Sequence, residues 1–360
     1  MTFAEKWRAM FWYLQQTEAA HAQRSKRLAQ WIAAPAGVLG RCSHTRTVER
    51  ARESFRHSPL SWFAVITFVW TWSIWLSLAL TGLHYELRIW KYLYVAGLSG
   101  PLVGAGAIAL MTGGWRGGWR LVKQVFIWKV SPAWYALGLF LAPALMLGTV
   151  FITRAVLHEK VEIPTPPLTW MLLAFGWMVV RGGPANEEVG WRGFLLPHLL
   201  KRHNPFWATL ILIPIWAAWH WPLWVLPGVP HKYWPFSYFF MLIAPISFLF
   251  TWLHVRARGS VLIAILFHSA INTTIHFVPL VPPRYPSLAP FAFWIGLTWA
   301  VTMLVIWTDR RIWFAEPKKE LACARRLSGG SMQMAPLMLS QPPARNWVSG
   351  CPADRWKWRR

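Results

Sequence analysis

Cysteine is nearly missing from this sequence of 360 residues, which contains only three. A small disulfide-stabilised scaffold needs many cysteines, so that class of protein is excluded. Cys42, Cys323 and Cys351 lie far apart and form no C-x-x-C pair, which excludes a zinc site built from cysteine ligands. We expect all three to be free thiols without a chemical role.

Acidic residues are also scarce, with 13 Asp and Glu against 37 Lys and Arg and a net charge of +24. Hydrophobic residues make up 55% of the chain, and the mean hydropathy is +0.32. Disorder of the whole chain is therefore excluded, because a disordered chain needs low hydrophobicity. A nucleic-acid-binding domain would explain the charge but not the apolar excess. Such a composition is typical of a polytopic membrane protein.

Apolar runs of about 20 residues, long enough to cross a hydrocarbon core as helices, recur along the chain. They predict eight spans, over residues 59–83, 92–111, 133–157, 168–200, 205–226, 236–255, 259–278 and 288–307. The fourth is the least regular, because polar residues lie in its middle. The sequence thus predicts an all-α, polytopic integral membrane protein with about eight transmembrane helices.

The basic residues predict the orientation of these helices. Eight spans place both termini on one side, and 29 of the 37 Lys and Arg then fall on that side against six on the other. Cytoplasmic loops carry an excess of Lys and Arg, so we expect both termini to be cytoplasmic. The positive charge is then a topology signal that also favours contact with anionic lipids, and nucleic acid is not an expected partner.

Three further segments lie outside or beside the spans. Residues 1–58 form a basic cytoplasmic segment without a cleavable signal pattern. Residues 115–130 (WRGGWRLVKQVFIWKV) are basic and aromatic, which favours an interfacial amphipathic helix on the cytoplasmic face, with an ordinary basic loop as the alternative. Residues 308–360 mix Pro, Gly, Ser and Arg without a period, and we expect a disordered tail.

Ionisable groups inside the fourth span are candidates for function, because charges in hydrocarbon cost several kcal/mol unless they are paired or face a polar cavity. Glu188 and Arg192 are four residues apart and share a helix face, which predicts an ion pair. Glu187 points about 100° away and stays available as a general base. The alternative is a buried ion pair that only locks helix packing.

Polar residues also interrupt two later spans. His220 lies in the fifth, and His268 and Asn272 lie in the seventh, four apart on one face. Burying all these polar groups costs the least free energy if they converge on one pocket that contains water. Such a site fits hydrolysis, but it also fits proton-coupled transport, for which we find no matching second half. A non-catalytic scaffold or immunity protein is a third interpretation.

Three short patterns occur in order, each in a predicted span. They are Glu187-Glu188-x-x-x-Arg192, Trp216-x-x-x-His220 and His268-x-x-x-Asn272. Together they resemble the motifs of the CPBP intramembrane proteases, which include the type II CAAX prenyl endopeptidases and the bacterial Abi proteins. The run from Gly190 to Pro197 resembles the bacterial branch. The resemblance covers residues 59–307 as an intramembrane protease domain, with one departure at Trp216, where Phe is usual.

The resemblance implies a peptidase with a specific division of roles. Glu187, supported by His220, would activate a water that attacks the scissile carbonyl. His268 and Asn272 would donate hydrogen bonds to the developing oxyanion, as in other acyl-transfer sites. Glu188 and Arg192 would orient the site. The expected substrate is a membrane-associated protein or peptide, prenylated or not, in the bacterial plasma membrane, and the sequence predicts no particular oligomeric state.

Metal dependence is the second question that the resemblance raises, because the family has also been described as metalloproteases. Glu187, His220 and His268 would supply the three protein ligands of a catalytic zinc. The sequence contains no H-E-x-x-H, the familiar zinc signature. We favour a metal-free, glutamate-activated water without a cofactor, and a zinc-dependent version is the alternative.

Overall fold

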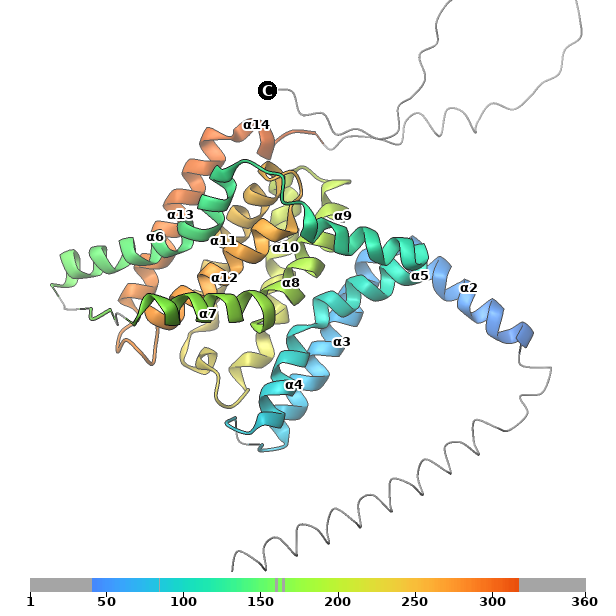
Figure 1. Cartoon of the computed structure of the whole chain (residues 1–360), viewed down its shortest axis with the longest axis horizontal. Coiled ribbons are helices and arrows are strands. Elements are labelled where there is room, and N and C mark those ends of the chain that lie inside the picture. Colours follow the sequence, from blue (N-terminus) through green and yellow to red (C-terminus); the bar gives the residue numbers. More distant parts are fainter. Residues whose placement is uncertain (1–40, 84, 159–160, 164–165, 317–360) are drawn as a thin grey trace, which may run out of the picture. The chain divides into compact units, whose positions relative to one another are not determined.

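The computed structural model describes residues 41–83, 85–158, 161–163 and 166–316, and it gives side chains from residue 49 onward. Over these ranges the chain forms helices and no strand (Figure 1). Five segments are long and apolar enough to cross a membrane, namely α3 (Pro59–Leu80), α6 (Pro132–Leu157), α10 with its extension (Pro205–Trp224), α11 (Phe236–Arg256) and α13 (Ala289–Thr308). The prediction of an all-α polytopic membrane protein is confirmed.

The predicted second span is a broken helix. α4 (Arg88–Leu98) and α5 (Gly100–Val122) meet at Ser99 with a bend of 49°, and as one span they raise the count from five to six. Two shorter apolar helices, α7 (Leu168–Arg181) and α12 (Val261–Phe277), fall in the predicted fourth and seventh spans. The expected total of eight spans stays a prediction.

The predicted fourth span is not one continuous helix. α7 ends at Arg181. Gly183 follows with a φ of 105°, a backbone conformation that residues other than glycine rarely adopt. Pro184 then starts α8 (Pro184–Gly190), as proline often does at a first helical position. A π-helical segment, η3 (Trp191–Leu195), follows and leads into α9 (Leu196–Leu200). The polar residues of this region therefore lie on a helix that starts in the middle of the predicted span.

The segment expected to be an interfacial helix is helical for most of its length. α5 kinks at Gly114, where φ is 59°, and a 3-10 turn over Lys123–Phe126 ends the helical part four residues before the predicted end. The kink is braced by α2 (Arg41–His57), because Arg52 Nε donates to the carbonyl of Met111 at 2.8 Å. A kink leaves carbonyls without helical partners, and this arginine satisfies one of them.

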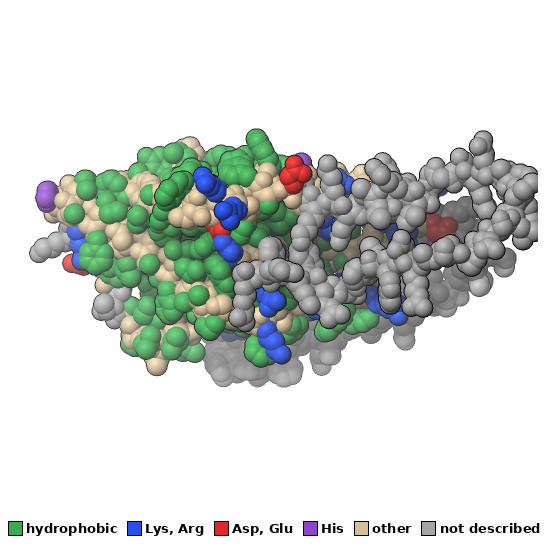
Figure 2. All heavy atoms as spheres, turned by 90° about the horizontal axis from the view of Figure 1, so that it is seen from above, with side chains coloured by type: hydrophobic (Ala, Val, Ile, Leu, Met, Phe, Trp, Pro, Cys, Tyr) green, Lys and Arg blue, Asp and Glu red, His purple; other side chains and the backbone are tan. Residues whose placement is uncertain are grey.

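The surface of the helices suits a hydrocarbon environment. Figure 2 shows hydrophobic side chains spread over most of the described surface on one face, with a few Lys and Arg among them. Large exposed apolar residues occur on several helices, including Phe140, Phe151, Trp170, Leu173 and Trp307. Residues 1–40 and 317–360, which hold most of the two predicted basic tails and two of the three cysteines, lie outside the described residues.

Close packing between α3 and α5 needs a glycine at position 100. A Cβ added to Gly100 would lie 2.1 Å from Thr71 Oγ1 and 2.8 Å from the carbonyl oxygen of Thr67. The Thr71 hydroxyl cannot easily move away, because it donates to the carbonyl of Gly97 and accepts from Trp219 Nε1. This contact fixes α5 against α3.

We predict that Gly100→Ala lowers the free energy of unfolding by about 1–3 kcal/mol, the usual cost of forcing an extra methyl group into a packed interface. The matched control is Gly106→Ala in the same helix, where a Cβ would meet nothing within 4 Å. The midpoint of thermal unfolding in detergent measures both variants. Equal midpoints would contradict the close packing of α3 and α5.

Candidate active site

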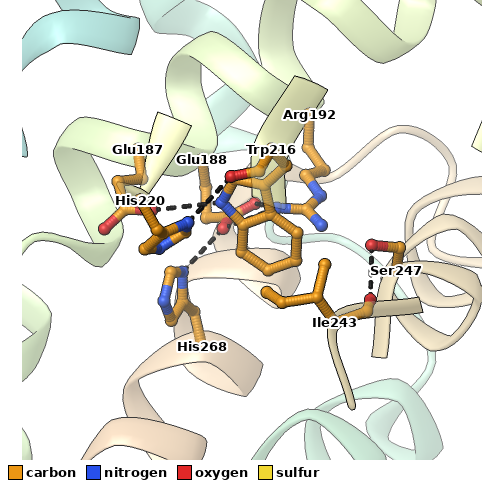
Figure 3. A network of polar contacts seen from close by, with 8 residues as sticks. All are labelled: Glu187, Glu188, Arg192, Trp216, His220, Ile243, Ser247 and His268. Atoms are coloured by element: carbon orange, nitrogen blue, oxygen red, sulfur yellow. Dashed lines mark hydrogen bonds and ion pairs between the residues drawn. The ribbon is translucent and has the colours of Figure 1, made fainter. Parts of the chain in front are cut away.

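Four helical segments bring the predicted polar residues together inside the protein (Figure 3). Glu187 and Glu188 come from α8, Arg192 from η3, His220 from the end of α10 and His268 from α12. α8 packs against both α5 and α12, and the Glu188 carboxylate of α8 contacts His268 of α12. Glu187, Glu188, Arg192 and His268 are all at least nine-tenths buried. These five side chains lie close together in the structure.

The Glu188 carboxylate is paired with Arg192. Arg192 Nη1 lies 2.9 Å from both oxygens of Glu188, and the two side chains are fully or almost fully buried. The guanidinium also lies between two aromatic rings, 4.2 Å from the centroid of Trp216 and 3.8 Å from that of Phe250. Cation–π contacts of this kind are strongest where water is excluded. The arginine is therefore held by charge on one side and by ring faces on the others.

His268 uses the same carboxylate. Its Nδ1 lies 2.7 Å from Glu188 Oε1. Because an ionised carboxylate only accepts, Nδ1 carries the proton, and Nε2 is the nitrogen that Glu188 does not hold. Glu188 thus ties the helix carrying Arg192 to α12 and orients the imidazole of His268.

The neighbouring carboxylate has a different environment. In the described part of the chain Glu187 forms no ion pair, and its one hydrogen bond is a long one, accepted by Oε2 from Trp216 Nε1 at 3.4 Å. Adjacent residues on a helix point about 100° apart, which separates the two carboxylates as the sequence spacing suggests. Glu188 is held by Arg192 and His268, whereas Glu187 has no ion-pair partner among the described residues.

His220 lies beside Glu187 with a defined orientation (Figure 3). Its Nδ1 is 2.8 Å from the carbonyl oxygen of Trp216, which only accepts, so Nδ1 is the donor. Nε2 is then left as an acceptor. Rings surround the imidazole, with centroids at 4.7 Å for Trp219 and 5.1 Å for Phe239.

Asn272 is the sixth predicted site residue. It lies on α12 one turn beyond His268 and is partly buried. Its side-chain amide forms no hydrogen bond with any described residue, and its backbone carbonyl accepts from His276. The amide can therefore serve an incoming ligand.

The residues expected for a zinc site do not fit a metal. Across the described ranges, no three His, Cys, Asp or Glu side chains form a group that could hold a metal ion. Glu187, His220 and His268 are close neighbours, but the geometry that a catalytic zinc requires of three ligands is not formed. The zinc-dependent alternative finds no support in this arrangement.

Two contributors to the site went unpredicted as site residues. The indole N–H of Trp216 binds Glu187, and the only signal for it is the tryptophan where the family motif usually has phenylalanine. Phe250 covers Arg192 but is one of several phenylalanines in a mostly apolar helix, so no pattern distinguishes it. A third residue, Gln124, lies outside the site and stabilises the π-helical segment that carries Arg192. Its side-chain amide donates to the carbonyl of Gly193 at 2.9 Å.

Part of the chain is similar to known proteins. Residues 168–274, which contain all six predicted site residues, match the family described as "Type II CAAX prenyl endopeptidase Rce1-like". A "CAAX prenyl protease 2" of Methanococcus maripaludis is 33% identical over 93 residues. Over this region the chain is similar to the CAAX protease family. The alignment with this relative covers 24% of the chain and 34% of the relative, so the chain spans about a third of that CAAX protease.

The buried ion pair between Glu188 and Arg192 yields a stability prediction. Glu188→Gln leaves Arg192 and His268 without their counter-charge in a dry environment, so we expect the free energy of unfolding to fall by about 3–5 kcal/mol. The reference is Arg256→Gln, which breaks an ion pair with Asp309 in which the arginine is 42% exposed. Exposed pairs contribute about 0.2–1 kcal/mol. Similar losses in the two variants, measured by denaturant unfolding in detergent, would contradict the buried pairing.

Proposed function

We propose that this protein is an intramembrane endopeptidase that hydrolyses a peptide bond in a membrane-associated protein or peptide. The observation that carries the proposal is the separation of two adjacent carboxylates. Glu188 is neutralised by Arg192 and His268, while Glu187 has no ion-pair partner among the described residues and lies beside His220. A free carboxylate and an imidazole acceptor within a buried site are suited to take a proton from water.

In the proposed first step, Glu187 and the Nε2 of His220 both bind one water molecule. The water oxygen bonds to the scissile carbonyl carbon, and its proton passes to Glu187. The tetrahedral intermediate then breaks its C–N bond as that proton is delivered to the leaving nitrogen. The products are a new carboxylic acid, which then loses its proton to the new amine, and Glu187 returns to its ionised form; no metal takes part in any step.

The negative charge of the intermediate would be met by His268 and Asn272. The site contains two glutamates and one arginine, so the buried charges balance if His268 is an imidazolium. Its Nδ1–H then binds Glu188 and its Nε2–H donates to the oxyanion, beside the free amide of Asn272. Glu188 and Arg192 orient these donors without reacting.

The substrate would reach this site from the membrane. The matched relative is named a CAAX prenyl protease, which makes a prenylated CAAX peptide the first substrate to test, alongside unprenylated membrane peptides. We place the protein in the bacterial plasma membrane, with the segment over residues 115–126 contacting anionic lipid through exposed Trp115 and Trp119 and neighbouring basic residues. The similarity to a protease family disfavours the transporter and scaffold alternatives.

The central catalytic prediction concerns Glu187→Gln, which keeps the shape of the side chain and removes its basicity. We expect cleavage of a substrate peptide in proteoliposomes to fall by about 10²–10⁴-fold, the usual contribution of a general base. The control is Glu162→Gln, which neutralises an exposed carboxylate outside the site. A Glu187→Gln rate within a few-fold of wild type, with the protein folded, would overturn the mechanism.

Metal independence is a separate prediction. Because water is activated by side chains alone in this mechanism, incubation with EDTA or 1,10-phenanthroline followed by desalting should leave the cleavage rate unchanged. Metal analysis of the purified protein accompanies the assay. Loss of activity on chelation that zinc alone restores would contradict the metal-free mechanism while leaving the peptidase assignment intact.

A further inference from the structure

Trp216 contacts every charged or titratable group of the site that is drawn in Figure 3 except Glu188. Its ring covers the Arg192 guanidinium at 4.2 Å and meets the rings of His220 and His268 edge-on at 5.7 and 5.9 Å. Its indole N–H points to Oε2 of Glu187. No other residue in the described chain makes this set of contacts.

The indole N–H is committed to Glu187 by burial. Trp216 is 2% exposed, so water does not reach its Nε1 readily, and an unpaired buried donor costs about 1–3 kcal/mol. Glu187 Oε2 is the acceptor that the structure supplies, at 3.4 Å. The ring cannot turn away easily, because Phe250 packs against it edge-to-face at 5.6 Å and Arg192 covers its face.

The same residue also fixes His220. The backbone carbonyl of Trp216 accepts the proton of His220 Nδ1 at 2.8 Å, which leaves Nε2 as the acceptor. Trp216 therefore holds Glu187 through its side chain and His220 through its backbone. A phenylalanine, the usual residue in the motif, keeps the backbone contact but has no N–H for the carboxylate.

We propose that Trp216 is a positioning residue that fixes Glu187 beside His220 and favours the ionised form of the carboxylate. The inference rests on the proposed role of Glu187 as the base. A donor aimed at a carboxylate stabilises its charged form relative to its protonated form. Trp216 thus keeps Glu187 ionised, and able to act as the base, at a lower pH than a phenylalanine at this position could.

The first test is Trp216→Phe, which removes the N–H and keeps an aromatic face over Arg192. We expect the acidic limb of the kcat profile to move toward higher pH by about 0.5–1 unit, the effect of one weakened hydrogen bond to a charged group. Above that limb kcat should stay within about threefold of wild type and KM should not change. Replacing Trp216 by benzothienylalanine, which substitutes sulfur for the N–H, should give the same shift.

The matched control is Trp219→Phe on the same helix. Trp219 is fully buried, and its N–H donates to Thr71 Oγ1 at 2.8 Å instead of to a carboxylate. This variant should leave the acidic limb of the kcat profile at the same pH, even if it changes kcat above that limb. The proposal is overturned if Trp216→Phe lowers the rate equally at every pH, or if Trp219→Phe moves the limb as far.

A second readout does not depend on cleavage. The indole ¹⁵N–¹H resonance of Trp216, assigned through Trp216→Phe, should shift in Glu187→Gln and remain in place in Glu162→Gln. An inactive wild-type protein that shows this shift would count against the proposed function and support the Trp216 contact. If the chemical shift of this resonance is unchanged in Glu187→Gln, the Trp216 proposal is overturned, even in an active enzyme.

Discussion

One carboxylate organises the interior of this protein. Glu188 binds Arg192 with both oxygens and His268 with one of them, and the three side chains lie almost entirely out of solvent. Burying such charges costs several kcal/mol each unless they are mutually neutralised in good geometry. The helices that carry them, α8 with η3 and α12, are therefore held in one relative position. The rings of Trp216 and Phe250 extend this constraint to α10 and α11, because both cover the same guanidinium.

The constraint on Glu188 gives two neighbouring carboxylates different properties. A pair of identical side chains becomes one fixed counter-ion and one free base because only one of them faces the arginine. The backbone contributes to this difference. α8 begins at Pro184, directly after the Gly182–Gly183 break, so Glu187 lies in the first turn of the helix and close to the chain that enters it. The π-helical segment that follows carries Arg192, and such segments are frequent at functional sites.

Much of this arrangement can be predicted from the sequence. Few charges, long apolar runs and a basic excess indicate a helical membrane protein, and the spacing of Glu188 and Arg192 indicates their ion pair. The cost of burying His220 and His268 alone suggests that they meet the glutamates. The helix breaks at Ser99 and Gly183 could not be predicted, because hydropathy is averaged over a window of residues and gives no information on backbone angles. The role of Trp216 could not be predicted either, because the motif requires only an aromatic residue at this position and does not distinguish an indole with an N–H from a phenyl ring.

The most direct test of the central claim is an experimental structure with a peptidyl trifluoromethyl ketone, whose hydrate mimics the tetrahedral intermediate. The division between Glu187 and Glu188 predicts one hydrate oxygen within hydrogen-bond distance of Glu187 and His220, and the other facing His268 and Asn272. Glu188 should remain on Arg192. A hydrate oxygen bound by Glu188, or a metal ion found between Glu187, His220 and His268, would contradict this account.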